Sequence, residues 1–403
     1  MKILFITTGF PPYMFSENIV NGKLVLAFKE KNWQVDVISK KEDVTFYSND
    51  WDYPFESLKE NTIEIEYKLG NKVIRIFDYL KCSLLLGFYS MNGNRWAYRA
   101  YKKALQLATE NNYDFIISRS PDDIAHLVAL KLKNRKKINW IANWNDPAQT
   151  IWPHPYKLKL SLLKRLSSQK LTKNVLKKAN YLTFPSDNLF KHFENNFKSI
   201  SKAKSKVIPH IEFSNLNLEK IENNNSTAVK LCHSGNLSLE RNPELLFKAI
   251  AEINENSEIK IYLDIIGKIN SYSMDLIKKY KLNNYINFLG SFNYFDSIQL
   301  INNYDYLVLV EAEMENGFFF PSKVVDYFQC NKPIISISPV NGFMKDLSKK
   351  EDRIIFIENT NYIVLVNTLK ELINNPFAKK IEKSDLFSSE RVLKIYSELF
   401  QNN

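Results

Sequence analysis

Short apolar runs alternate with amphipathic stretches along the N-terminal part of the chain. Residues 2–7 (KILFIT) and 34–38 (QVDVI) are apolar and rich in β-branched side chains, as β-strands are. Between them, residues 21–31 (NGKLVLAFKEK) carry apolar side chains at helical spacing. This pattern predicts a β-α-β unit, with the helix starting near Asn21 and Gly22.

The same alternation continues as far as Pro209. Further strands are expected at 114–118, 138–142, 181–185 and 206–208, and helices at 122–133 and 157–179. A parallel sheet with helices on both faces is the architecture that such a sequence favours.

A polar, Asn-rich run at 211–228 has no apolar periodicity and is predicted to be a linker. A second alternating region follows it. Its strands are expected at 229–233, 260–266, 285–289, 306–310 and 333–337, and its helices at 242–254, 271–281, 294–303 and 322–330.

The sequence therefore predicts an α/β protein with two tandem Rossmann-like domains, at 1–210 and 229–385. In the remaining segment, 386–403, a helix at 389–400 is expected to cross back to the first domain. Open α/β sheets bind ligands at the carboxyl ends of their strands, so we expect the active site between the domains.

Composition narrows the class of protein. A chain of 403 residues exceeds what one core usually organises. The cysteines, Cys82, Cys232 and Cys330, are far apart and lack CxxC or Cys/His spacing, which predicts neither disulfides nor a zinc site and favours a cytoplasmic setting. No stretch approaches the roughly 20 apolar residues of a membrane-spanning helix.

The formal net charge of +11 favours an anionic partner such as phosphate groups, nucleic acid or an acidic lipid surface. Richness in Lys, Asn and Ile is equally typical of an AT-rich genome. A nucleic-acid recognition motif is missing from the sequence, so we expect no nucleic-acid partner.

Four segments carry candidate chemistry, and the first follows the first predicted strand. There, Ser16, Glu17 and Asn18 precede a predicted helix N-terminus and are candidates to contact a hydroxyl or an anionic oxygen. The spacing is not GxGxxG, and an ordinary strand-turn-helix connection is the alternative.

The second segment is HSGNLSLERNPELL. Gly235 allows close approach of a ligand to the backbone, and Arg241 provides a planar, permanently charged group for anionic oxygens. A diphosphate fits this pair.

The third segment is EAEMENGFFFPSKVVDYF. Pro321 suits the first position of a helix, where Ser322 and Lys323 would present donors to a phosphate. Asp326 lies one turn further and suits ribose hydroxyls, although a surface ion pair between Lys323 and Asp326 is the alternative.

The fourth segment, NWIANWNDPAQTIWPHP, places Asp146 before Pro147. This carboxylate is a candidate to bind a sugar or to act as a base, and a plain turn is the alternative.

These segments together resemble the GT-B glycosyltransferases of the retaining family GT4. The resemblance extends over nearly the whole chain and is most specific in FPSKVVDYFQCNKPIIS. It implies the GT-B architecture, in which Arg241 contacts the donor diphosphate and Asp326 the donor ribose. Asn236 stands where the family has a companion arginine, and Gly235 belongs to the same donor loop.

The resemblance also implies a glutamate for the donor sugar, but Phe318 occupies that position. Three glutamates lie just upstream, and of these Glu313 or Glu315 is expected to face the sugar. His126 is the closest match to a first-domain histidine that assists at the reacting sugar. Core packing of His126 is the alternative.

The implied activity is transfer of a sugar from a nucleotide-sugar donor to a glycan or lipid-linked acceptor, with retention of configuration, in cell-surface polysaccharide synthesis. Neither a metal nor a cofactor is expected, because basic side chains can neutralise the leaving diphosphate. A sugar-nucleotide epimerase and a nucleotide-sugar-binding protein without turnover are the alternatives.

The stretch 157–179 resembles a basic amphipathic surface helix, and an apolar insertion lies near 77–89. Both are expected to dock on an anionic membrane surface, which would make the protein peripheral on the inner face of the cell membrane. Core packing with a solvated lysine face is the alternative.

Overall fold

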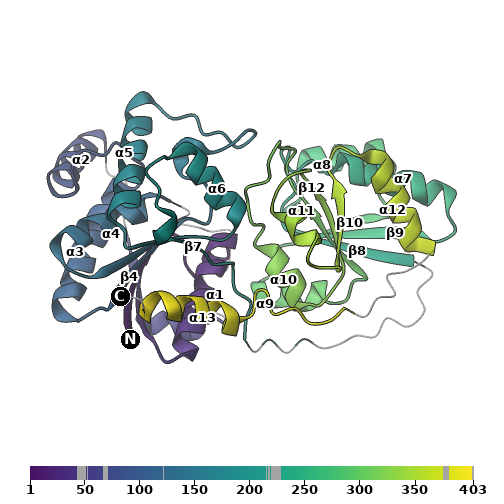
Figure 1. The fold of residues 1–403 in the computed structure, drawn as a ribbon. Coiled ribbons are helices and arrows are strands. Elements are labelled where there is room, and N and C mark those ends of the chain that lie inside the picture. Colours follow the sequence, from purple (N-terminus) through teal and green to yellow (C-terminus); the bar gives the residue numbers. More distant parts are fainter. Residues whose placement is uncertain are drawn as a thin grey trace. The chain divides into compact units, whose positions relative to one another are not determined.

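The computed structural model describes residues 1–42, 51, 53–66, 71–120, 122–214, 216, 218, 228–374 and 381–401. The chain forms two compact units (Figure 1). The first comprises Met1–Pro153, Lys157–Ser214 and Phe387–Asn403, and the second His154–Tyr156 and Asn215–Leu386. Most of the linker expected at 211–228 lies outside the described residues.

The first unit is built on a parallel sheet of seven strands in the order β3-β2-β1-β4-β5-β6-β7. Its strands are β1 (Lys2–Thr7), β2 (Gln34–Lys40), β3 (Thr62–Ile65), β4 (Phe115–Arg119), β5 (Asn139–Asn143), β6 (Tyr181–Phe184) and β7 (Ser205–Val207). Strand order reverses between β1 and β4, where Ile3 pairs with Phe115. Loops at such a reversal, at the carboxyl ends of the strands, are where open α/β sheets bind ligands.

Helices cover this sheet. They are α1 (Ser16–Glu30), α2 (Lys72–Leu86), α3 (Asn94–Glu110), α4 (Ile124–Arg135), α5 (Leu162–Lys178) and α6 (Asp187–Asn196), with short 3-10 turns at Glu56–Asn61, Gln149–Ile151 and Lys202–Lys204. Helix α5 begins at Leu162, five residues later than the expected start at 157.

Helix α1 begins at Ser16, so the expected start near Asn21 and Gly22 was wrong. Gly22 lies inside the helix for a packing reason. A Cβ atom at Gly22 would come within 2.7 Å of the rings of Phe55 and Pro11. The glycine thus permits close packing and does not mark a helix end.

The second unit has a parallel sheet of six strands in the order β10-β9-β8-β11-β12-β13. Its strands are β8 (Ala228–Ser234), β9 (Lys260–Ile266), β10 (Ile286–Gly290), β11 (Tyr306–Val310), β12 (Ile334–Ser338) and β13 (Ile354–Glu358). Its helices are α7 (Glu244–Asn256), α8 (Ser271–Lys279), α9 (Tyr294–Ile301), α10 (Lys323–Gln329), α11 (Phe343–Ser348) and α12 (Tyr362–Asn374).

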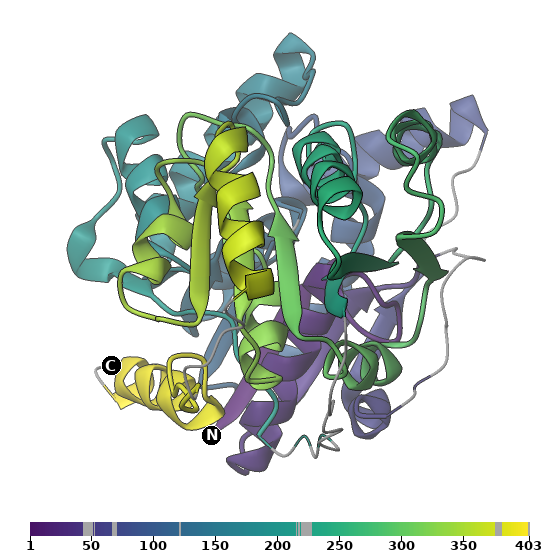
Figure 2. The ribbon, with the colours of Figure 1, turned by 90° about the vertical axis from the view of Figure 1, so that its right-hand side faces the viewer.

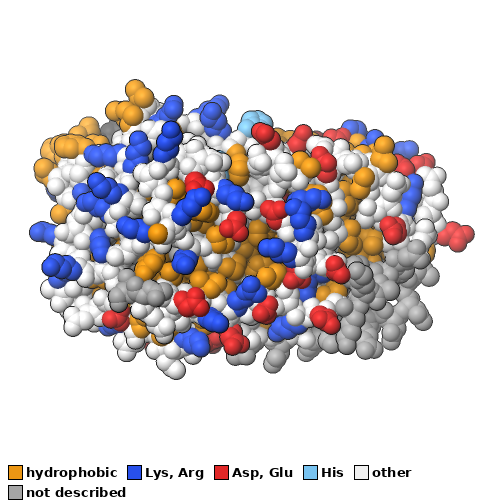
Figure 3. Space-filling view, in the orientation of Figure 1, with side chains coloured by type: hydrophobic (Ala, Val, Ile, Leu, Met, Phe, Trp, Pro, Cys, Tyr) orange, Lys and Arg blue, Asp and Glu red, His pale blue; other side chains and the backbone are white. Residues whose placement is uncertain are grey.

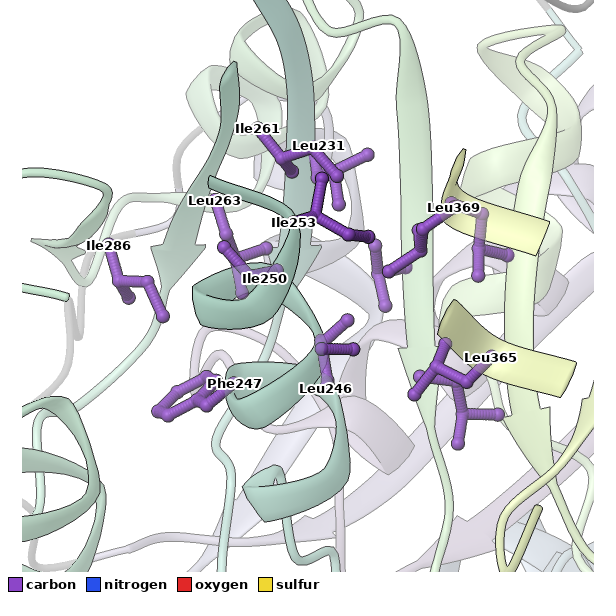
Figure 4. Close-up of a cluster of buried hydrophobic side chains, with 14 of the residues drawn as sticks. Leu231, Leu246, Phe247, Ile250, Ile253, Ile261, Leu263, Ile286, Leu365 and Leu369 are labelled. Atoms are coloured by element: carbon purple, nitrogen blue, oxygen red, sulfur yellow. The ribbon is translucent and has the colours of Figure 1, made fainter. Parts of the chain in front are cut away.

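Helices α7 and α12 pack on the same face of this second sheet, as Figure 2 shows. Phe247 and Ile250 of α7 meet Leu263 of β9, and Leu365 and Leu369 of α12 complete the same buried cluster (Figure 4). Burial of each such side chain contributes about 1.5–3 kcal/mol. This core holds the strand ends that carry the donor-side residues.

The last helix, α13 (Ser389–Gln401), belongs to the first unit and lies beside α1 (Figure 1). The Tyr396 ring meets the Phe28 ring edge to face with 5.0 Å between centroids. Val392, Leu393 and Leu399 are buried in the core that includes Phe28. The chain therefore returns to its first unit to complete that core.

Candidate functional site

The loop after β8 brings backbone close to the neighbouring strand ends in the second unit. The Gly235 amide donates to the carbonyl of Ile266 at 2.6 Å, and the Lys268 amide donates to Asn236 Oδ1 at 2.8 Å. Gly235 has φ +128°, a conformation that side chains rarely adopt. Asn236 therefore ties two loops together at the carboxyl edge of the sheet.

Lys323 reaches this glycine loop from α10. A Cβ atom at Gly235 would lie 2.5 Å from Lys323 Nζ, so only glycine leaves room for the amine. Nζ also lies 3.4 Å from Nε2 of the buried His233. His233 Nδ1 lies 2.9 Å from the carbonyl oxygen of Val308, which can only accept, so Nδ1 carries the proton and Nε2 accepts from Lys323.

Lys323 interacts electrostatically with a second cation, Arg241, and with the carboxyl group of Glu311. Burial and, to a smaller extent, the charge of Arg241 lower the pKa of Lys323 to about 7. Burial raises the pKa of Glu311 to about 7 against the opposing effects of a hydrogen bond with Ser338 and the charges of Arg241 and Lys323. An anion placed beside Arg241 and Lys323 would stabilise both cations.

Asp326 accepts a hydrogen bond from the hydroxyl of Tyr294, the first residue of α9. Burial and the nearby Asp326 charge hold the pKa of Tyr294 well above its usual value. Asp326 also acts on Lys323, whose pKa its charge raises. Lys323 and Asp326 thus share one environment, and the side chain of Ser322 at the start of α10 makes no capping hydrogen bond.

The three glutamates after β11 differ in placement. Glu311 follows the strand directly and is partly buried, whereas Glu313 and Glu315 are exposed. Glu311 and Glu313 line a pocket of about 530 Å³ whose other walls include Asn242 and Thr360. Glu311 interacts electrostatically with Arg241 and Lys323. The structure thus draws attention to Glu311, which the sequence had not selected.

In the first unit, side chains from the end of β4, the loop after β5 and the start of α1 form one polar network. Arg119, the last residue of β4, donates to Asn145 Oδ1 at 3.0 Å, and Asn145 Nδ2 donates to Glu17 Oε2 at 2.6 Å. The pKa of Glu17 is raised to about 8 by burial and by the charge of Asp146. Glu17 and Asp146 are therefore neighbouring carboxyl groups at the carboxyl edge of the first sheet.

The remaining residues expected on the acceptor side have different environments. Asn18 is buried and donates to the carbonyl of Phe10 at 3.0 Å, which fixes the loop before α1. Ser16 is exposed at the first position of that helix.

His126 lies in the core of the first unit, with 0% of its surface exposed. Ser118 Oγ accepts from Trp140 Nε1 at 2.8 Å and also lies within hydrogen-bond distance of His126 Nδ1, at 2.8 Å. Burial lowers the pKa of His126 to about 3, so the ring is neutral at physiological pH. In this arrangement the ring offers no surface to a sugar, which favours the core-packing alternative.

The described residues show neither a metal-binding cluster nor a membrane-spanning helix. They contain no group of three or more His, Cys, Asp or Glu side chains arranged to hold a metal ion. Among the helices in that part of the chain, none combines the length and apolar character needed to cross a bilayer.

Comparison with known families decides the identity of the second unit. The family model described as glycosyl transferases group 1 matches residues 215–386, which include every donor-side residue above. The second unit matches this family model over nearly its whole length. A search of curated protein sequences found no match.

The whole chain has the fold of solved GT-B proteins. The sucrose-phosphate synthase of Thermosynechococcus elongatus matches with TM-score 0.69 and 15% identity, and Anabaena Alr3699/HepE in complex with UDP and glucose with TM-score 0.69 and 14% identity, each over 100% of both chains. The UDP-GlcNAc 2-epimerase of Methanocaldococcus jannaschii matches with TM-score 0.55 and 13% identity, over 99% of this chain and 100% of its own. At such identities the likeness shows the fold, and two tandem Rossmann-like domains are confirmed.

In the second unit, sequence reasoning missed His233 and Tyr294 as partners of Lys323 and Asp326. Glu311 was within reach, because it is the first residue after a fully buried strand and ligand-binding side chains concentrate there. In the first unit, Arg119 carried a similar signal as the last residue of β4.

Proposed function

We propose that this glycosyltransferase moves a sugar from a nucleotide-sugar donor to a glycan or lipid-linked acceptor, with retention of configuration and without a metal ion. The observation that carries the proposal is the electrostatic interaction of Arg241 with Lys323, whose amine lies beside Gly235, within the residues that match the group 1 family.

The second unit is proposed to hold the donor. Arg241 and Lys323 would neutralise the diphosphate, and the tight loop at Gly235 would let its oxygens approach the backbone. Asp326, held by Tyr294, would accept hydrogen bonds from the ribose hydroxyls. Glu311 is proposed to meet the donor sugar, in place of the glutamate that Phe318 replaces.

The first unit is proposed to hold the acceptor. Glu17 and Asp146 adjoin each other, and burial keeps the proton of Glu17 up to a pKa of about 8. A protonated carboxyl group can donate a hydrogen bond to an acceptor hydroxyl while a neighbouring carboxyl oxygen accepts one. Ser16 is the exposed polar neighbour at the start of α1.

The test uses the full chain with UDP-, GDP-, ADP- and CMP-sugars. A donor that fits should raise the unfolding temperature, and NMR should then show a new glycosidic linkage of the donor's own anomeric configuration with a pooled acceptor mixture. Change of the sugar's configuration without transfer would instead support the epimerase, and binding without any turnover would support a binding protein.

Arg241→Ala tests whether the donor binds at the proposed site. Loss of a hydrogen bond to a charged group costs about 1.5–3 kcal/mol, so nucleoside diphosphate affinity should fall about 10- to 150-fold. Lys350→Ala, at another exposed cation of the same unit, serves as the matched control. Unchanged affinity in Arg241→Ala would remove Arg241 from the site.

A further inference from the structure

Helices α2 and α5 of the first unit expose an unusual amount of apolar side chain. The most exposed residues are Ile76, Phe77 and Leu84 on α2, Phe88 in the loop after it, and Leu162 and Leu163 at the start of α5. Leu84 is 85% exposed, and Phe88 and Leu162 are each 70% exposed. We call this region the α2–α5 surface.

The two helices contribute to one continuous surface. The Ser90 amide, just after α2, donates to Ser167 Oγ of α5 at 2.8 Å, and Lys164 Nζ donates to Asn92 Oδ1 at 2.9 Å. Figure 3 shows hydrophobic side chains gathered over α2 and the end of α5, with Lys and Arg side chains next to them. Apolar and cationic groups are therefore presented together.

Helix α2 buries few of its apolar side chains against its own unit. Only its last turns reach the core, through Cys82, Ser83 and Leu86. Below the rest of the helix lies a hollow of about 400 Å³ with Arg75 and Tyr79 in its wall. A helix that is apolar on most sides is normally covered, and exposed patches of this kind mark interaction sites.

The positive charge of the α2–α5 surface indicates what kind of partner covers it. The whole stretch 157–179 contains no Asp or Glu but eight Lys or Arg residues. On α2, Arg75 and Lys81 are exposed, and the one acidic residue, Asp78, forms an ion pair with Arg95. A second copy of this chain would bring like charges together, which is unfavourable, whereas an anionic partner complements them.

We propose that the α2–α5 surface docks on an anionic lipid bilayer. The apolar side chains would enter the boundary between headgroups and acyl chains, and the lysines and arginines would stay at the level of the lipid phosphates. Aromatic side chains such as Phe77 and Phe88 suit that boundary. This inference goes beyond the proposed transfer reaction, because the docking needs neither donor nor acceptor.

The experiment is flotation of the full chain with vesicles of phosphatidylcholine alone or with about one third phosphatidylglycerol. The anionic vesicles should bind more protein, and binding should fall with salt because each Lys or Arg near the surface contributes an attraction that salt screens. The triple variant Ile76→Ser/Phe77→Ser/Leu163→Ser should bind at least about tenfold less, since it removes three large apolar contacts.

A matched control replaces equally exposed apolar residues of the second unit, Leu239→Ser/Ile363→Ser, which should bind as wild type. Circular dichroism checks that both variants keep their helical content. Arg75→Glu/Lys81→Glu should lose the preference for anionic vesicles, and Lys198→Glu/Lys278→Glu should keep it.

Equal binding of the α2–α5 triple variant and wild type would overturn the proposal, as would equal binding to neutral and anionic vesicles. Analytical ultracentrifugation without lipid tests the alternative that a second copy of this chain covers the α2–α5 surface. A wild-type dimer that the triple variant abolishes would show that a second copy covers this surface. Because vesicle binding is read without a sugar donor, its failure is distinguishable from failure of the transferase activity.

Discussion

Lys323 Nζ lies 3.4 Å from Nε2 of His233, and the other ring nitrogen of this histidine faces the carbonyl oxygen of Val308. The histidine therefore presents a fixed acceptor to the lysine. Since burial also keeps the pKa of His233 well below its usual value, the ring adds no second positive charge beside the amine. Lys323 is thus held in place while its own pKa lies near neutrality.

Donor binding should take up a proton. The pKa of Lys323 is about 7 in the free protein, and a bound diphosphate would raise it. Nucleoside diphosphate affinity should therefore be constant well below pH 7 and fall by up to about tenfold per pH unit above it. Calorimetry at pH 8.5 in buffers of different ionisation enthalpy should show uptake of about one proton.

Lys323→Gln is the control for this pH dependence, because it should bind more weakly and lose the slope above pH 7. A wild-type affinity that stays constant from pH 6 to pH 9 would show that Lys323 does not contact the diphosphate.

Gly235→Ala should impair donor binding, because its Cβ would lie 2.5 Å from Lys323 Nζ and displace the amine. Gly290→Ala is a matched control. Gly290 also has a positive φ, +85°, but a Cβ there would meet nothing within 4 Å. Both variants carry backbone strain of about 1–2 kcal/mol, but only Gly235→Ala should lower nucleoside diphosphate affinity, by at least about tenfold. Equal affinities would show that the contact with Lys323 has no role in binding.

Glu311→Gln should reduce sugar transfer more than the same change at Glu313 or Glu315. Glu311 is partly buried and interacts with Arg241 and Lys323, whereas the other two side chains are exposed. Loss of a charged hydrogen bond to the sugar predicts a fall in kcat/KM of about 10- to 150-fold. Glu315→Gln, the control, should stay within about twofold of wild type. If kcat/KM fell strongly only in Glu313→Gln or Glu315→Gln, that residue would be the one that contacts the donor sugar, as the sequence first indicated.

Glu17→Gln should make the protein less sensitive to alkaline pH. The folded-state pKa of Glu17, about 8, is above the usual value, so the folded state holds this proton more tightly than the unfolded state. That contribution to the free energy of unfolding is complete below about pH 4.5 and is lost as pH rises through 8.

The free energy of unfolding of Glu17→Gln minus that of wild type should therefore be larger at pH 8.5 than at pH 5. The unfolding temperature difference should change by about 2–4 °C for each kcal/mol in a unit of this size. Glu60→Gln, at an exposed glutamate of the same unit, should show no such trend. A constant difference across this pH range would argue that Glu17 is ionised throughout.

Buried strands could be predicted closely because their apolar runs are continuous. Strand β11 has the expected bounds, 306–310, and all five of its residues are buried. Strands β3 and β13 were missed, and both lie at a sheet edge where one side lacks a partner strand. In β3 all four residues are only partly buried, which weakens the apolar signal.

The candidate site was harder to predict because its contacts join distant parts of the chain. Asn145 reaches Glu17 across 128 positions, and Arg119 reaches Tyr396 across 277. The spacing of residues within one segment of the sequence does not indicate contacts with a distant segment. Sequence reasoning named Glu17 and Asp146 from their loops, but it could not show that they adjoin or that Asn145 connects Glu17 to Arg119.

The packing of α13 into the core of the first unit has a consequence for synthesis. Val392, Leu393, Tyr396 and Leu399 leave the ribosome long after Phe28 and Val35, with which they share one buried core. Domains generally fold as units during translation, N-terminal first. Here part of the core of the first unit stays uncovered until the whole second unit and then α13 have been made. A nascent chain arrested before residue 389 should therefore be a preferred substrate for chaperones, although the sheet of its first unit is already fully synthesised.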